Sequence, residues 1–105
     1  STGTATAVYA GLAPLSIGTD TAGSIRIPAA WHSLVGFKPA KGAIPMNGVL
    51  PLSKSFDSLG TICKTVKDTK ILFNMMFFQD FDVIFDRFQH FEWEIRQTCV
   101  SDGMK

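Results

Sequence analysis

Short apolar runs alternate with stretches of small or helix-favouring residues along the first three quarters of the chain. The apolar runs occupy residues 12–17, 34–38 and 59–64, and each predicts a short strand. Small residues fill positions 4–10 and predict a tightly packed helix that ends at Gly11. Strands that alternate with helices are typical of an α/β layer, in which helices cover a sheet.

Local signals predict two further helices. Pro28 suits the first turn of a helix over residues 25–33, because proline lacks the N–H group that this position leaves unpaired. Thr65, with Asp68 three residues later, has the spacing of a helix N-cap. One face of the helix that follows would carry Val66, Thr69, Phe73 and Met76.

The stretch between the second and third predicted strands, residues 39–58, holds three of the five prolines. Loops of this length in compact domains are mostly functional, or are ordered by the structure around them. We therefore expect an ordered loop here.

The last part of the chain has a different pattern. Aromatic and aliphatic residues recur at helical spacing, which predicts an amphipathic helix within residues 77–105. A helix packed on a core is the favoured interpretation, and a helix that binds a membrane surface or a partner is the alternative. We divide the chain accordingly into a domain over residues 1–76 and this C-terminal tail.

The composition is that of a globular protein, with 46% hydrophobic and 18% charged residues. A net charge of +1 gives no electrostatic reason to expect nucleic acid, and no apolar run approaches the roughly 20 residues of a membrane span. Cys63 and Cys99 are far apart, as are the two histidines, so no metal-ligand spacing is present. Two isolated thiols favour a reducing compartment such as the cytoplasm.

Residues 18–24 (GTDTAGS) contain two glycines and predict a turn. A glycine-flanked turn can point several backbone N–H groups toward one spot and so bind a negatively charged oxygen. A serine at its end would place a hydroxyl beside that spot, as acyl transfer requires. The same pattern also fits a plain strand-to-helix connection or a phosphate site, although the lysine of a nucleotide-binding P-loop is missing.

The longer segment over residues 18–30, GTDTAGSIRIPAA, resembles the core motif of the amidase signature family. The similarity continues through LVGFKP at residues 34–39, GVLPLS at 48–53 and SFDSLG at 55–60. It covers approximately residues 1–76. The resemblance implies part of a mixed sheet flanked by helices, an amidase that acts on a small-molecule amide, and no cofactor or metal.

The resemblance also implies how the chemistry is divided. Ser24 matches the family's nucleophile, and the backbone N–H groups of Thr21, Ala22, Gly23 and Ser24 match its oxyanion donors. The family's triad adds a serine in a cis peptide bond and a lysine. The cis-serine position falls immediately before Ser1 and the lysine lies further upstream, so we predict negligible activity for this polypeptide alone.

Neighbouring polar residues have supporting or structural interpretations. We expect Asp20 to accept backbone N–H bonds within the turn, and Arg26 to pair with a carboxylate and so hold the turn rigid. His32 and His90 are interpreted as packed or solvated residues, because no carboxylate that would orient a catalytic histidine is evident. The alternative to an enzyme is a non-enzymatic remnant that associates with another chain through exposed sheet edges.

Overall fold

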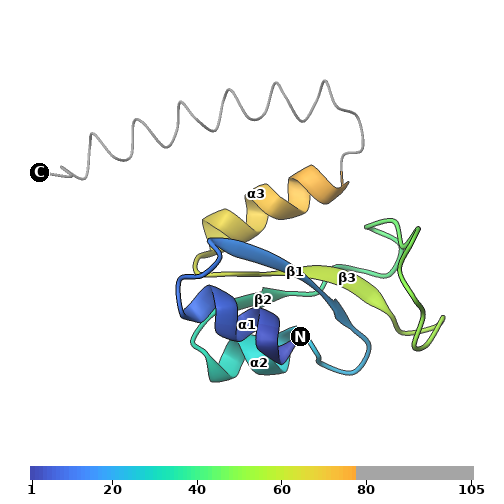
Figure 1. Ribbon diagram of the computed structural model, residues 1–105. Coiled ribbons are helices and arrows are strands. Elements are labelled where there is room, and N and C mark those ends of the chain that lie inside the picture. Colours follow the sequence, from blue (N-terminus) through green and yellow to red (C-terminus); the bar gives the residue numbers. More distant parts are fainter. Residues whose placement is uncertain (78–105) are drawn as a thin grey trace, which may run out of the picture.

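The computed structural model describes residues 1–77, which form a small sheet with helices on both faces (Figure 1). The predicted helix within residues 77–105 lies, apart from Phe77, outside the described residues. The elements follow in the order α1 (Thr2–Tyr9), β1 (Leu15–Asp20), α2 (Arg26–Trp31), β2 (Val35–Phe37), β3 (Ser58–Cys63) and α3 (Val66–Phe77). The predicted α/β layer is confirmed.

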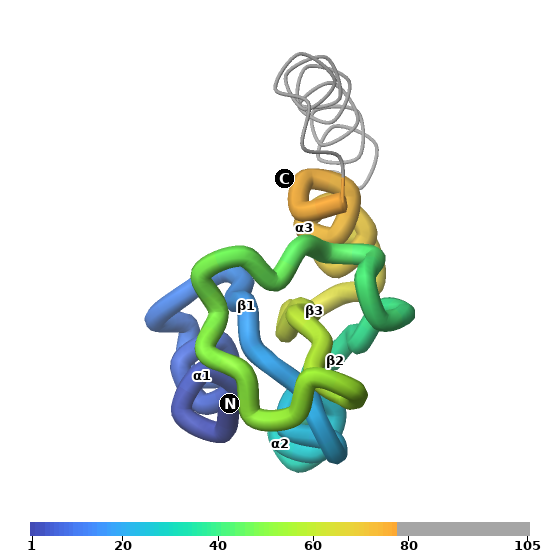
Figure 2. The backbone as a smooth tube through the Cα atoms, turned by 90° about the vertical axis from the view of Figure 1, so that its right-hand side faces the viewer, coloured from blue at the N-terminus to red at the C-terminus, as the bar shows by residue number. Residues whose placement is uncertain are grey.

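The sheet has the strand order β1–β3–β2, and both pairings are antiparallel. Helices α1 and α2 lie against one face and α3 against the other, as Figures 1 and 2 show from two directions. The first strand therefore hydrogen-bonds to the last one, with Leu15 opposite Cys63 and Asp20 opposite Ser58.

The predicted position of the first strand was wrong. Residues 12–14 are not part of it, and β1 instead runs from Leu15 to Asp20. Pro14 has no N–H group to donate to a ladder, which explains the later start. The strand extends through Gly18 and Thr19, where a turn was expected, because these residues pair with Gly60 and Leu59 of β3.

The core lies between the sheet and the two N-terminal helices. It consists of the fully buried side chains of Ala5, Ile25, Ala29 and Ile62, with Leu34 packed against them. Gly60 makes this packing possible, since a Cβ atom there would collide with the carbonyl oxygen of Phe37.

Helix α3 confirms one local prediction and corrects another. The Asp68 N–H donates to Thr65 Oγ1 at 3.1 Å, so Thr65 is the expected N-cap. Val66, however, is 64% exposed, and the buried residues of the helix are Thr69 and Leu72. The face toward the sheet is therefore displaced from the predicted one, and Phe73 reaches β2 through an edge-to-face contact with Phe37.

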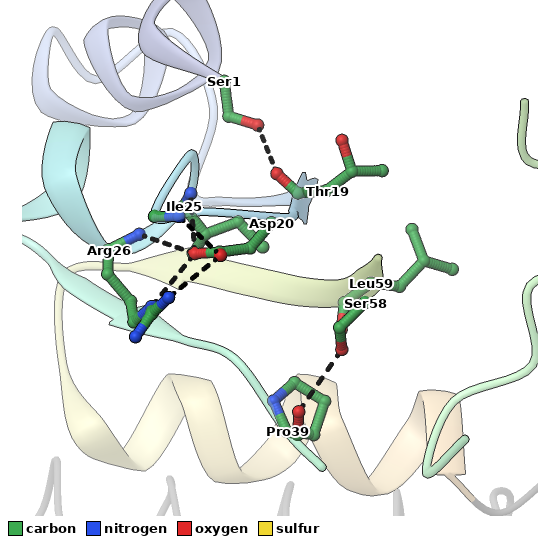
Figure 3. Close-up of polar contacts among 9 residues, drawn as sticks. Ser1, Thr19, Asp20, Ile25, Arg26, Pro39, Ser58 and Leu59 are labelled. Atoms are coloured by element: carbon green, nitrogen blue, oxygen red, sulfur yellow. Dashed lines mark hydrogen bonds and ion pairs between the residues drawn. The ribbon is translucent and has the colours of Figure 1, made fainter. Parts of the chain in front are cut away.

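The long loop over residues 38–57 is tied to the body at several points. Ile44 is buried, and the Ser58 hydroxyl donates to the Pro39 carbonyl oxygen at 3.3 Å (Figure 3). The side chain of Asp57, the last residue of the loop, accepts the N–H groups of Leu52 and Ser53. The loop is thus ordered, as the sequence predicts.

Candidate active site

Residues 21–25, called here the 21–25 turn, connect the end of β1 to the start of α2. Gly23 makes the reversal with φ +121°, a backbone conformation that side-chain-bearing residues rarely adopt. A Cβ atom at this position would also lie 2.6 Å from Ile27 Cδ1. The glycine directly before Ser24 is therefore required by the backbone geometry.

The Asp20 carboxylate holds this turn in place from the end of β1. Its Oδ1 accepts the Gly23 N–H at 2.8 Å, and its Oδ2 accepts the N–H groups of Ile25 at 3.1 Å and Arg26 at 3.3 Å (Figure 3). The Arg26 guanidinium adds a bond to each oxygen, both at 3.1 Å. The contacts expected of Asp20 and Arg26 are thus present, and they join these two residues to each other.

The same contacts keep the Asp20 carboxyl ionised. Its burial opposes ionisation, but the hydrogen bonds from Arg26 and from the N–H groups of Ile25, Gly23 and Arg26 outweigh it and lower the pKa of Asp20 to about 2. Asp20 is fully buried, whereas the Arg26 side chain is 55% exposed. A permanently charged acceptor therefore sits under the turn and satisfies the first N–H groups of α2.

Ser24 is exposed at the outer side of the turn. The ladder with β3 ends at Asp20, and within residues 1–77 the N–H groups of Thr21, Ala22 and Ser24 have no hydrogen-bond acceptor. Gly23 differs from the expectation, because its N–H donates to Asp20. The donors that remain for an oxyanion are those of Thr21, Ala22 and Ser24.

Asp57 is a further polar residue at the site, which the sequence interpretation left as an ordinary loop residue. The Thr21 hydroxyl donates to Asp57 Oδ1 at 2.5 Å. The antiparallel register explains this contact, since Thr21 and Asp57 are the next two residues beyond the final ladder pair of Asp20 and Ser58. Only a known pairing of β1 with β3 could have revealed it.

His32 lies between the two N-terminal helices. Its Nδ1 is 2.7 Å from the Pro28 carbonyl oxygen, its Nε2 is 3.1 Å from Thr6 Oγ1, and its ring packs edge-on against Tyr9. These contacts confirm the packing role expected of it. His90 lies outside the described residues.

Cys63 is buried in β3, and burial raises the pKa of its thiol. No group of three or more metal-ligating side chains occurs within residues 1–77. Helices long and apolar enough to cross a membrane are likewise absent from that part of the chain.

Known proteins share this segment. The family model described as Amidase matches residues 1–99, which extends beyond the expected boundary at residue 76. One of the proteins that make up the glutamyl-tRNA(Gln) amidotransferase of Persephonella marina is 47% identical over 74 residues, which are 70% of this chain and 15% of that protein. Indoleacetamide hydrolase of Pseudomonas syringae pv. syringae is 42% identical over 74 residues, which are 70% of this chain and 17% of that protein.

Two solved structures agree. A crystal structure of an amidase superposes with a TM-score of 0.70 at 45% identity, over 71% of this chain and 17% of that one. An amidase family protein from Bacillus anthracis str. Ames gives the same TM-score and identity, over 76% of this chain and 16% of that one. The chain thus spans only about a sixth of the length of these proteins.

Proposed function

Because this chain belongs to the amidase family, we propose that it supplies the nucleophile and oxyanion site of an enzyme that hydrolyses a small-molecule carboxamide. The observation that carries the proposal is the exposed Ser24 hydroxyl beside backbone N–H groups that the fold leaves without an acceptor. An amide carbonyl at this position would meet a nucleophile and hydrogen-bond donors together.

In the proposed reaction, Ser24 Oγ attacks the amide carbonyl carbon. The N–H groups of Thr21, Ala22 and Ser24 stabilise the negative oxygen that develops. Ammonia or an amine leaves as the C–N bond breaks, and water then hydrolyses the acyl ester and releases the carboxylate. Asp20 and Arg26 keep the turn rigid so that these donors need little reorganisation.

The proton of Ser24 needs an acceptor, and within residues 1–77 no side chain hydrogen-bonds to its hydroxyl. The family resemblance assigns this task to a serine immediately before Ser1 and to a lysine further upstream. The start of α1 is suitably placed, because the Ser1 hydroxyl lies 3.4 Å from the carbonyl oxygen of Thr19, near the end of β1 (Figure 3). We therefore expect the polypeptide alone to be inactive.

The proposal is tested by grafting residues 1–77 onto the matching segment of the Pseudomonas indoleacetamide hydrolase, which supplies the rest of the fold. We expect the graft to release ammonia from indoleacetamide. Ser24→Ala should lower kcat by at least about a thousandfold, as loss of a serine nucleophile does elsewhere. Ser55→Ala, at an exposed loop serine, is the matched control and should leave kcat unchanged. A graft that works equally well with Ser24→Ala would refute the proposal.

The inactivity of the polypeptide alone has its own test. A serine-reactive fluorophosphonate should leave the 105-residue chain unlabelled, because Ser24 lacks a base. Strong labelling of Ser24 would show that the base lies within this chain.

Association through a sheet edge is the second candidate function. Leu15 and Ile17 of the edge strand β1 are substantially exposed, and Leu12 precedes them at 83% exposure. An unpaired edge with apolar side chains favours pairing with another strand. Sedimentation of the 105-residue chain, compared with an Ile17→Lys variant, tests this candidate: a wild-type chain that is monomeric at high concentration would exclude self-association.

A further inference from the structure

The end of the β1–β3 ladder carries a contact that the reaction outlined above does not use. Thr21 leaves the ladder directly after Asp20, and its partner in the register, Asp57, approaches the ladder directly before Ser58. In place of a backbone bond, the Thr21 hydroxyl donates to the Asp57 carboxylate at 2.5 Å. This short bond to a charged acceptor extends the pairing of the two strands by one residue.

The Asp57 carboxylate is itself fixed by its own loop. The Leu52 N–H donates to Oδ2 at 2.7 Å, and the Ser53 N–H is 3.0 Å from both carboxylate oxygens. The N–H groups of Phe56 and Asp57 in turn donate to the Ser53 carbonyl oxygen. Asp57 is almost completely buried, so its position is determined by the fold rather than by solvent.

These contacts also favour the charged form of Asp57. The Thr21 hydroxyl lowers the pKa of Asp57 most strongly, and the N–H groups of Leu52 and Ser53 lower it further against the opposing effect of burial. The acceptor that faces Thr21 is therefore a carboxylate at neutral pH.

We propose that Asp57 is a positioning residue, which holds Thr21 so that its backbone N–H points at the developing oxyanion. This inference rests on the proposed function. Asp20 grips the 21–25 turn at Gly23, Ile25 and Arg26, but it makes no contact with Thr21. The Asp57 bond supplies the missing restraint at the other end of the turn. Without it, Thr21 has no side-chain or N–H hydrogen bond within residues 1–77.

Thr21→Val is the cleanest perturbation, because it removes the hydroxyl, keeps the branched shape and leaves the Asp57 loop intact. Thr19→Val is the matched control, since Thr19 is an exposed threonine on the same strand. Thr21→Ser restores the hydroxyl and serves as the conservative rescue. Asp57→Asn removes the charge of the acceptor.

The first readout is backbone 15N relaxation in the 105-residue chain. We expect the order parameters of residues 21 and 22 to fall from about 0.85 to below about 0.6 in Thr21→Val. They should stay high in Thr19→Val and in Thr21→Ser. Unchanged order parameters in Thr21→Val would overturn the inference, and so would an equal fall throughout β1 and β3, which indicates general support of the fold. This measurement involves no catalysis, so it stands or falls independently of the proposed function.

The second readout is kinetic and uses the grafted hydrolase. Because an oxyanion donor acts mainly in the transition state, Thr21→Val should lower kcat by about tenfold and leave KM within about twofold. Asp57→Asn should have no further effect on kcat once Thr21→Val is present, since both changes break the same bond. Additive effects, or a change in KM alone, would refute a positioning role even where Ser24 proves to be the nucleophile.

Discussion

Replacing Asp20 by asparagine tests the central restraint of the 21–25 turn. The side chains have nearly the same shape, but asparagine offers one acceptor oxygen and one NH2 group. If the oxygen takes the place of Oδ2, the NH2 group faces the Gly23 N–H and the Arg26 guanidinium. In the reverse orientation it faces the N–H groups of Ile25 and Arg26 and the guanidinium Nε. Either way, at least two donors lose their acceptor.

The expected cost follows from how buried these donors are. A buried donor left without an acceptor costs about 1–3 kcal/mol. The Arg26 side chain is largely exposed and can turn to water, so its share is at the low end. The backbone N–H groups cannot move away without opening the start of α2. We therefore expect Asp20→Asn to lower the free energy of unfolding by about 3 kcal/mol.

Urea unfolding of the 105-residue chain, followed by far-ultraviolet circular dichroism, measures this loss. With a slope of about 1–3 kcal/mol per molar urea, the midpoint should fall by about 1–3 M. Asp68→Asn is the matched control. It makes the same chemical change in the first turn of α3, where only a helix-dipole effect of about 0.5 kcal/mol is at stake. A loss no larger for Asp20→Asn than for Asp68→Asn would refute the idea that the carboxylate holds the turn.

Three further predictions concern stability. The low pKa of Asp20 means that the folded chain binds fewer protons than the unfolded one below the ordinary value of 3.8, so its contribution should be complete above pH 4 and lost as the pH falls toward 2; urea midpoints measured across this range should show this for the wild type and not for Asp20→Asn. Gly60→Ala should destabilise by about 1–3 kcal/mol, because its methyl group would strike the Phe37 carbonyl oxygen, whereas Gly3→Ala, in open space on α1, should not destabilise the chain by thermal melting. Ile25→Ala removes a fully buried core side chain and should cost about 2–5 kcal/mol in urea unfolding; a loss below about 1 kcal/mol would contradict the assigned core.

Local patterns in the sequence were sufficient for the helices and for the position of the serine. Thr65 and Asp68 have an N-cap spacing that needs no distant partner, and Gly23 before Ser24 indicates a backbone reversal wherever the chain folds. The contacts of Asp20 and Arg26 were also accessible, because both residues lie within six positions of each other. Interactions of this kind depend on short-range geometry alone.

Features that depend on strand pairing were not accessible in this way. Gly18 and Thr19 have the composition of a turn, and they are a strand only because β3 hydrogen-bonds to them. The contact between Thr21 and Asp57 has the same origin, since no local signal relates the two residues. Likewise, the face of α3 that meets the sheet is set by the position of β2 and β3, which places Val66 in solvent.

The separation of Thr21 and Asp57 has a consequence for how the protein is made. The two residues lie 36 positions apart in the chain. Synthesis at roughly 5–20 residues per second puts roughly 2–7 s between their addition to the nascent chain. Throughout that interval the segment around Ser24 is held only from the Asp20 side. Its geometry is therefore completed by a residue that the ribosome delivers late, and slower translation of residues 22–57 would prolong the incomplete state.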